Sequence, residues 1–294
     1  MEEGKLTLNK TEETFNFEHH IAIVNDIRLH YVMAGSGEPI VLLHGWPQTW
    51  YEWKDIIPAL AQSYTVIVPD LRGAGLSDKP VTGYDKLTLA KDIYLLVEQL
   101  GFKEVSLVGH DIGAMVAFTY ANEYPEEVKK LVLLDTLLPG FGLEQLMDVA
   151  NGGMWHFGFH MVDDLPETLV TGREYEYLNY YFKKLSYNPT SIKEEDVAEY
   201  VFQYSRPGAL RAGFNYYRTL LEDGRYGQKY KEHKLKMPIL AYGGETSTGD
   251  NLRQSILSIA DHVEGGSIPE CGHYIAEEQP EFLINALTKF LSQS

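Results

Sequence analysis

The sequence predicts an α/β fold, with a mostly parallel central sheet, flanking helices and a helical cap inserted after the sixth strand. Short apolar runs alternate with helical patterns in both halves of the 294-residue chain, which is typical of a sheet covered on both faces. Between about Leu137 and Lys234 this alternation stops, and the pattern becomes helical and rich in aromatic residues. We therefore predict a core of residues 1–136 and 233–294 and a helical cap of residues 137–232.

Hydrophobic periodicity along the chain predicts the individual strands and helices. Two opening strands, Ile21–Val24 and Arg28–Ala34, are joined through Asn25-Asp26 and predict an antiparallel hairpin. Because the cap follows the strand at Leu131–Leu134, it should cover the carboxyl ends of the strands, where open α/β sheets bind ligands. Further strands are expected at Ile40–Leu43, Thr65–Val68, Val105–Val108, Leu131–Leu134, Ile239–Tyr242 and His262–Ile268, and helices at Leu87–Leu100, Ala114–Glu123, Asn251–Ala260 and Pro280–Leu291.

Composition and charge narrow the class of protein. The formal net charge of −17 argues against nucleic acid as a partner, since phosphate binding needs clustered Lys and Arg. No apolar run is long enough to span a membrane, so we expect no membrane partner. We expect a small-molecule substrate and leave a homodimer open. Cys271 is the only cysteine, which excludes an intrachain disulfide and a Cys-rich metal site; we expect no metal and no cofactor. The polar segment Met1–Lys5 lacks an apolar secretory signal, which predicts a cytoplasmic protein unless a leader has been removed.

Asp111 is the predicted nucleophile. The strand Val105–Val108 runs into Gly109-His110-Asp111-Ile112-Gly113 and then into a helix, the strand–turn–helix context in which small residues flank a strained, exposed nucleophile. A carboxylate is ionised at neutral pH and needs no base before it attacks an electrophilic carbon. Its attack on an acyl carbon would give a labile anhydride, whereas attack on a strained or activated alkyl carbon gives an ester. The pattern therefore predicts alkylation of Asp111.

The second half of such a reaction needs a base and a site for an oxyanion. His273 follows the last strand and can take a proton from the water that attacks the ester. The backbone N–H groups of Trp46 and Ile112 are expected to bind the oxyanion, because the loop after Ile40–Leu43 should lie beside the nucleophile turn.

A third group must orient His273 and stabilise its cation. Asp135 directly ends a strongly apolar strand and lies between nucleophile and histidine in the chain order expected of this arrangement. Glu245 ends the next strand and is the alternative. We favour Asp135.

These motifs together resemble the α/β-hydrolase superfamily over nearly the whole chain. The resemblance is specific to the branch with aspartate nucleophiles, which contains epoxide hydrolases, haloalkane dehalogenases and fluoroacetate dehalogenases. The segments that carry it are His44-Gly45-Trp46-Pro47, Asp70-Leu71-Arg72-Gly73-Ala74-Gly75-Leu76-Ser77, Gly109-His110-Asp111-Ile112-Gly113 and Cys271-Gly272-His273.

Within this branch the chain looks most like the Cif-type bacterial epoxide hydrolases, a likeness carried by the segments 48–53, 155–157 and 214–218. In ordinary epoxide hydrolases two cap tyrosines hold the epoxide oxygen, and in the Cif-type group a histidine replaces one of them. The resemblance therefore implies that His156 and Tyr217 are the ring-opening pair and that Asp135 is the acid of the triad. Two donors suit this chemistry, because the alkoxide that leaves an opened epoxide must be stabilised.

Two departures favour a neutral epoxide over a halogenated substrate. Fluoroacetate dehalogenases carry arginines just after the nucleophile, where this chain has Ile112 and Met115. Haloalkane dehalogenases usually place a tryptophan donor next to the nucleophile, and the side chain of Ile112 cannot donate. The sequence therefore predicts a cofactor-free epoxide hydrolase, with a dehalogenase of the same branch or a non-catalytic binding protein as the alternatives.

Overall fold

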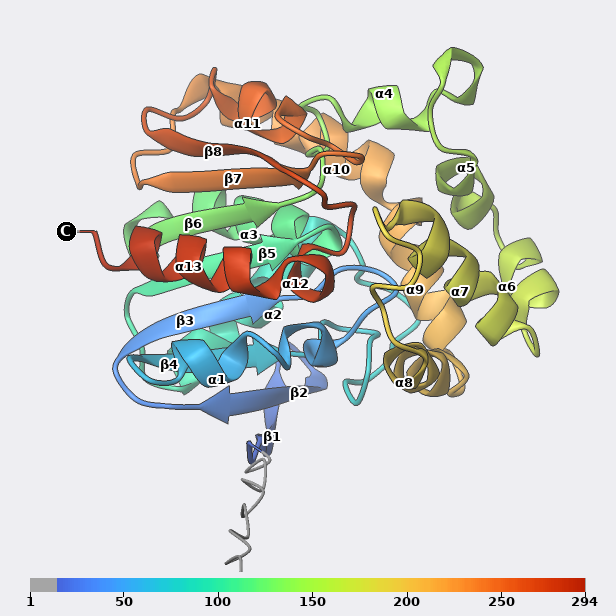
Figure 1. Ribbon diagram of the computed structural model, residues 1–294, viewed down its shortest axis with the longest axis horizontal. Helices are drawn as coiled ribbons and strands as arrows, with labels where there is room; N and C mark the ends of the chain where they lie inside the picture. Colours follow the sequence, from blue (N-terminus) through green and yellow to red (C-terminus); the bar gives the residue numbers. More distant parts are fainter. Residues whose placement is uncertain (1–14, 294) are drawn as a thin grey trace, which may run out of the picture.

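The computed structural model describes residues 15–293 and contains an eight-stranded sheet in the order β1-β2-β4-β3-β5-β6-β7-β8 (Figure 1). Within this part of the chain, no helix is long and apolar enough to cross a membrane. Residues Met1–Lys5, on which the expectation about a leader rests, lie outside the described residues. The strands are β1 (Glu18–Val24), β2 (Ile27–Ala34), β3 (Glu38–Leu43), β4 (Tyr64–Pro69), β5 (Val105–His110), β6 (Val128–Leu134), β7 (Ile239–Gly244) and β8 (Val263–Ile268).

The opening hairpin is confirmed, and its turn explains the residues found there. β1 pairs antiparallel with β2, and β2 pairs antiparallel with β4, whereas all other neighbours are parallel. Asn25 and Asp26 have φ values of 47° and 63°, so both central residues are left-handed, as a two-residue hairpin turn of type I′ requires. Asn and Asp tolerate this backbone region better than other non-glycine residues do.

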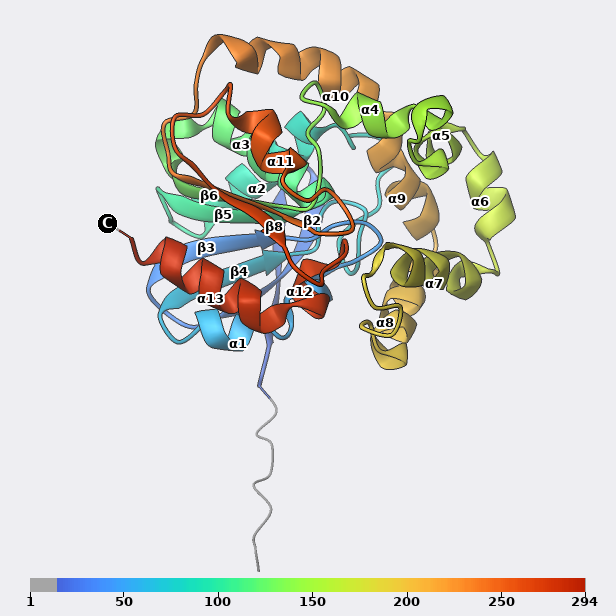
Figure 2. The same cartoon turned by 45° about the horizontal axis from the view of Figure 1, so that its top comes forward.

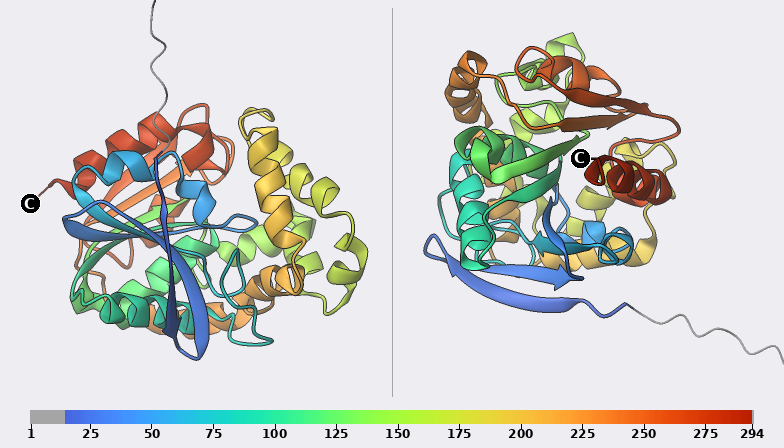
Figure 3. Two further views of the ribbon diagram at one scale, coloured as in Figure 1. Left: turned by 90° about the horizontal axis from the view of Figure 1, so that it is seen from below. Right: turned by 90° about the vertical axis from the view of Figure 1, so that its left-hand side faces the viewer.

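Helices cover both faces of the sheet (Figure 3). A separate apolar core lies on each side. The strands β3, β5 and β6 contribute residues to both cores, as expected of parallel strands buried on two faces. One face carries α2 (Lys86–Gln99), α3 (Ile112–Glu123) and α11 (Asn251–Ile256), and the other carries α1 (Ile57–Leu60) and α13 (Pro280–Leu291). The expectation that α11 extends to Ala260 is wrong, because Ala260 forms an isolated bridge with Leu235 and the chain must turn before it.

A helical segment connects β6 to β7, as the change of pattern predicts. Its helices α5 to α9 gather beyond the carboxyl ends of the parallel strands (Figures 1 and 2). Most of its aromatic residues pack against one another, with Tyr181, Tyr200, Phe214 and Tyr216 almost fully buried. The segment contains α4 (Leu143–Met147), η3 (Val149–Asn151), α5 (Trp155–Met161), α6 (Leu165–Val170), α7 (Glu174–Leu185), α8 (Glu194–Tyr204), α9 (Ala209–Arg218), α10 (Leu220–Gly227) and η4 (Gln228–Glu232).

Candidate active site

Asp111 lies in a sharp turn between β5 and α3. Its φ of 48° and ψ of −118° lie outside the regions that a residue with a side chain prefers, a strain that costs of the order of 1–3 kcal/mol. The flanking glycines permit this turn. A Cβ on Gly109 would lie 2.3 Å from the carbonyl oxygen of Gly113, and one on Gly113 would lie 2.2 Å from that of Leu43. Only glycine lets these backbones pass so closely.

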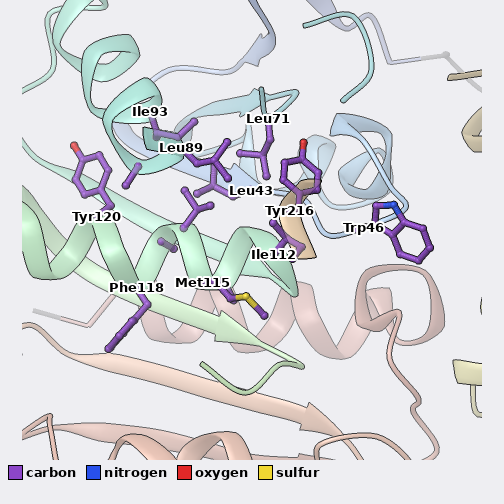
Figure 4. Packing of buried hydrophobic residues seen from close by; sticks show 14 of the residues in the cluster. Leu43, Trp46, Leu71, Leu89, Ile93, Ile112, Met115, Phe118, Tyr120 and Tyr216 are labelled. Carbon is purple, nitrogen blue, oxygen red and sulfur yellow. The ribbon is translucent and has the colours of Figure 1, made fainter. Parts of the chain in front are cut away.

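The loop after β3 meets this turn, as the sequence predicts. The backbone N–H of Trp46 donates to Oδ2 of Asp111 over 2.9 Å. Ile112 begins α3, and a helix leaves its first N–H groups without acceptors inside the helix. Figure 4 shows Ile112 at the start of this helix and Trp46 on the neighbouring loop. The structure therefore places the Trp46 N–H against the Asp111 carboxylate, and the Ile112 N–H belongs to the residue that follows Asp111 at the start of α3.

His273 and Asp135 form a direct pair at the ends of the sheet. Nδ1 of His273 lies 2.6 Å from Oδ2 of Asp135, and since an ionised carboxylate only accepts, the Nδ1–H of the imidazole donates. Burial alone would raise the pKa of Asp135, but the hydrogen bond and charge of His273 outweigh burial and hold this pKa below its ordinary value. The proton on Nδ1 leaves Nε2 of His273 free to accept a proton.

Asp135 is also held by hydrogen bonds that no sequence motif indicated. Its Oδ1 accepts from the backbone N–H of Gly244 at 2.8 Å and from the hydroxyl of Thr248 at 2.8 Å. Its Oδ2 accepts from the hydroxyl of Ser247 at 2.5 Å. Gly244 ends β7 and the two hydroxyls lie on the loop after it, and only folding shows that this segment meets the end of β6.

Glu245, the alternative acid, lies elsewhere. Its side chain is exposed, and its Oε2 accepts a hydrogen bond from the backbone N–H of Glu270 at 2.9 Å. Among the described residues, no ion pair joins Glu245 to His273. The geometry therefore favours Asp135 as the group that orients His273.

The helical segment between β6 and β7 supplies part of the wall of the cavity that Asp111 lines. His156 on α5 and Tyr217 on α9 are 7% and 4% exposed, with their ring centroids 5.9 Å apart. Burial, opposed by the charge of Asp111, lowers the pKa of His156 to about 4. Burial and the charge of Asp111 raise the pKa of Tyr217 well above its ordinary value. Both side chains are therefore neutral at neutral pH and still carry a hydrogen to donate.

These groups line one cavity, whose empty space is about 520 Å³ and partly open to solvent. No Lys or Arg contributes to its wall. The hydroxyls of Thr136, Ser247 and Thr248 already donate to protein acceptors. The lining residues are Trp46, Asp111, Asp135, Thr136, Leu143, Leu146, Met154, His156, Phe157, Tyr181, Leu185, Tyr217, Ser247, Thr248, His273 and Tyr274.

A buried ion pair beneath the nucleophile was not predicted from the sequence. His110 lies 3.0 Å from the carboxylate of Glu52, and its Nε2–H donates to the backbone carbonyl of His273 at 2.8 Å. Burial lowers the pKa of His110, but the charge of Glu52 more than compensates and raises it to about 10. Glu52 also accepts the backbone N–H of Gly45 at 2.9 Å. The pair thus connects the three loops that carry Trp46, Asp111 and His273.

The fold and this site define a hydrolase with an aspartate at the nucleophile turn. Residues 38–280 match the family described as alpha/beta hydrolase fold, and the chain belongs to this family. It is 43% identical over 280 residues to the soluble epoxide hydrolase of Corynebacterium sp. (strain C12), an alignment that covers 93% of this chain and 97% of that protein. The solved structure of epoxide hydrolase CorEH without ligand has a TM-score of 0.87 and 41% identity, and covers 94% of this chain and 99% of its own. A fluoroacetate dehalogenase from Burkholderia sp. is 28% identical over 95% of each chain.

Proposed function

We propose that this protein is an epoxide hydrolase, which converts a small neutral epoxide to a vicinal diol through an ester of Asp111. The observation that carries the proposal is the placement of two neutral donors, His156 and Tyr217, on the cavity wall contributed by the cap, with Asp111 on the wall contributed by the core. The 43% identity to a soluble epoxide hydrolase supports it independently.

In the first step Oδ1 of Asp111 attacks one epoxide carbon, and the bond between that carbon and the epoxide oxygen breaks. Oδ2 is already held by the N–H of Trp46, so it becomes the carbonyl oxygen of the new ester. The departing oxygen takes the hydroxyl proton of Tyr217 while the N–H of His156 stabilises it. An alkoxide is a stronger base than an ordinary phenolate, so the departing oxygen can accept the hydroxyl proton of Tyr217.

In the second step Nε2 of His273 takes a proton from water, and the water oxygen attacks the ester carbonyl carbon. The resulting oxyanion is bound by the N–H groups of Trp46 and Ile112. When the intermediate collapses, the diol oxygen leaves and takes the proton from His273. The remaining proton of the attacking water returns to Tyr217, which restores the ionised Asp111 and the neutral tyrosine. Asp135 keeps His273 in the required tautomer throughout.

The alternative is a dehalogenase of the same family, for which the Burkholderia relative is the precedent. An anionic haloacid would need a cation in the cavity, whose wall has none. The discriminating experiment compares diol formation from epibromohydrin with halide release from chloroacetate and from a bromoalkane, using Asp111→Asn as the control. Diol formation at a rate at least about 100-fold above halide release supports the proposal. Halide release without diol formation would overturn it, and turnover of neither would favour the non-catalytic alternative.

We extend the proposal to the setting of the enzyme. Residues 137–232 form a cap domain on a core of residues 1–136 and 233–294, because the helices between β6 and β7 carry His156 and Tyr217 while the core carries the other site residues. A cytoplasmic location and action on small molecules are in keeping with the name of the Corynebacterium relative, which describes that protein as soluble.

A further inference from the structure

The end of helix α9 is fastened to the core immediately before Tyr217. A helix leaves its last carbonyl groups without N–H partners, and here the carbonyl of Tyr216 accepts from Nζ of Lys86 at 2.9 Å. The hydroxyl of the same Tyr216 donates to the backbone carbonyl of Arg72 at 2.6 Å. Tyr216 packs in the same apolar cluster as Leu71 and Ile112 (Figure 4). One residue of the cap is thus tied to the core through both its backbone and its side chain.

Lys86 is unusual for a lysine because it is only 1% exposed. Its Nζ also lies 3.0 Å from Oδ2 of Asp223 and 3.2 Å from the hydroxyl of Thr219. Its backbone N–H donates to Oδ1 of Asp223 at 2.9 Å. Taking a cation and a carboxylate out of water is costly, and an apolar side chain of similar length often serves stability equally well. What the charged pair adds is a fixed geometry between the start of α2 and the junction of α9 and α10.

The hydroxyl of Tyr217 has no comparable support of its own. No hydrogen bond to it occurs within residues 15–293, and its ring is in edge contact with Trp46, Phe157 and His160. Tyr217 follows Tyr216 directly on α9, so the contacts of Tyr216 hold the backbone from which the Tyr217 ring projects. The position of the hydroxyl relative to Asp111 therefore depends on where the backbone of α9 is held.

We infer that Lys86 and Tyr216 are positioning residues that set the distance between the Tyr217 hydroxyl and the epoxide oxygen. This inference rests on the proposed function of Tyr217. A donor acts on a developing oxyanion only within about 2.7–3.1 Å, and a displacement of about 1 Å can cost up to about 100-fold in rate. Loss of either contact should therefore slow alkylation of Asp111 and leave ester hydrolysis, which uses His273, nearly unchanged.

The test compares Lys86→Met and Tyr216→Phe with Lys130→Met. Lys130 is a matched control, because its Nζ also donates to carbonyls at the end of a helix, those of Phe290 and Leu291 in α13, and α13 belongs to the core. Ester formation on Asp111 is followed by rapid quench and mass spectrometry with a small apolar epoxide. We expect alkylation to fall about 10-fold in Lys86→Met and in Tyr216→Phe, and less than about 2-fold in the control. Tyr216→Phe removes one hydroxyl only, so it carries the test if Lys86→Met does not fold.

Two further measurements separate positioning from a general structural effect. In a Tyr217→Phe background the same substitutions should change alkylation by less than about 2-fold, since the group they position is gone. In protein labelled with ¹³C at the tyrosine ring, the Tyr217 resonance, identified by its absence in Tyr217→Phe, should shift in both variants and not in Lys130→Met. This readout needs no turnover, so it tests the inference even if epoxide hydrolysis is disproved. An unshifted Tyr217 resonance, or an equal loss of both half-reactions, would overturn it.

Discussion

Replacement of Asp135 by asparagine should stop the reaction at the ester. Oδ1 accepts from two groups that can only donate, the backbone N–H of Gly244 at 2.8 Å and that of Thr248 at 3.3 Å. An amide NH₂ in that place would leave these buried donors unpaired, at a cost of about 1–3 kcal/mol each. The asparagine must therefore keep its oxygen there and turn its NH₂ toward Ser247 and His273. The serine hydroxyl can reverse and accept.

The imidazole can accept from this NH₂ only by moving its proton from Nδ1 to Nε2. His273 then presents a hydrogen to the attacking water and cannot take the water's proton. We expect ester hydrolysis to slow by about 10³- to 10⁴-fold, which is about 4–5 kcal/mol of activation free energy. Alkylation of Asp111 does not use His273 and should change by no more than a few-fold, so the ester should accumulate.

The assay is single-turnover mass spectrometry of Asp135→Asn, with Glu245→Gln as the control because Glu245 is exposed and bonded to Glu270. The control should hydrolyse the ester within about 2-fold of the wild-type rate. If Glu245→Gln were the slower variant, the orienting role would move to Glu245. If Asp135→Asn slowed alkylation and hydrolysis equally, the tautomer argument would be refuted.

Three other expectations follow from the same geometry. His273→Gln should trap the Asp111 ester; normal turnover in that variant would contradict the two-step mechanism. Tyr217→Phe and His156→Phe should each slow alkylation by about 10- to 10³-fold, and the effects on the activation free energy should be less than additive in the double variant. A wild-type alkylation rate in both single variants would show that these residues serve packing only. Because His156 has a pKa of about 4 in the folded protein against about 6.5 when unfolded, the unfolded state binds the proton first as pH falls. Between pH 6.5 and pH 4 the free energy of unfolding of the wild type, measured with urea, should thus fall by up to about 3 kcal/mol more than that of His156→Phe. If the free energies of unfolding of the two proteins changed equally with pH, the lowered pKa of a buried His156 would be contradicted.

The features predicted correctly are those with short-range physical causes. The turn that carries Asp111 could be predicted from five consecutive residues, because a chain that turns so tightly needs glycine at positions 109 and 113. The mostly parallel sheet follows from apolar runs that only a doubly covered sheet can bury, and the helical connection from β6 to β7 follows from the change of pattern after Leu134.

The features missed depend on contacts between distant segments. Glu52 lies 58 positions before His110 in the sequence, and nothing local indicates that the two side chains form a buried ion pair. The same holds for Ser247 and Thr248, which bond to Asp135 from the loop of another strand. The overlong prediction for α11 has a similar origin, since the helix ends early in order to place Ala260 beside Leu235.

The most direct test of the central claim is a single turnover in H₂¹⁸O with the enzyme in excess over an epoxide. If Asp111 forms an ester and water attacks its carbonyl, the first diol carries only ¹⁶O, and the new ¹⁸O appears in the peptide that contains Asp111. Asp111→Asn should give neither diol nor label. Diol labelled with ¹⁸O in the first turnover, together with an unlabelled Asp111 peptide, would show that water attacks the epoxide directly and would contradict the mechanism.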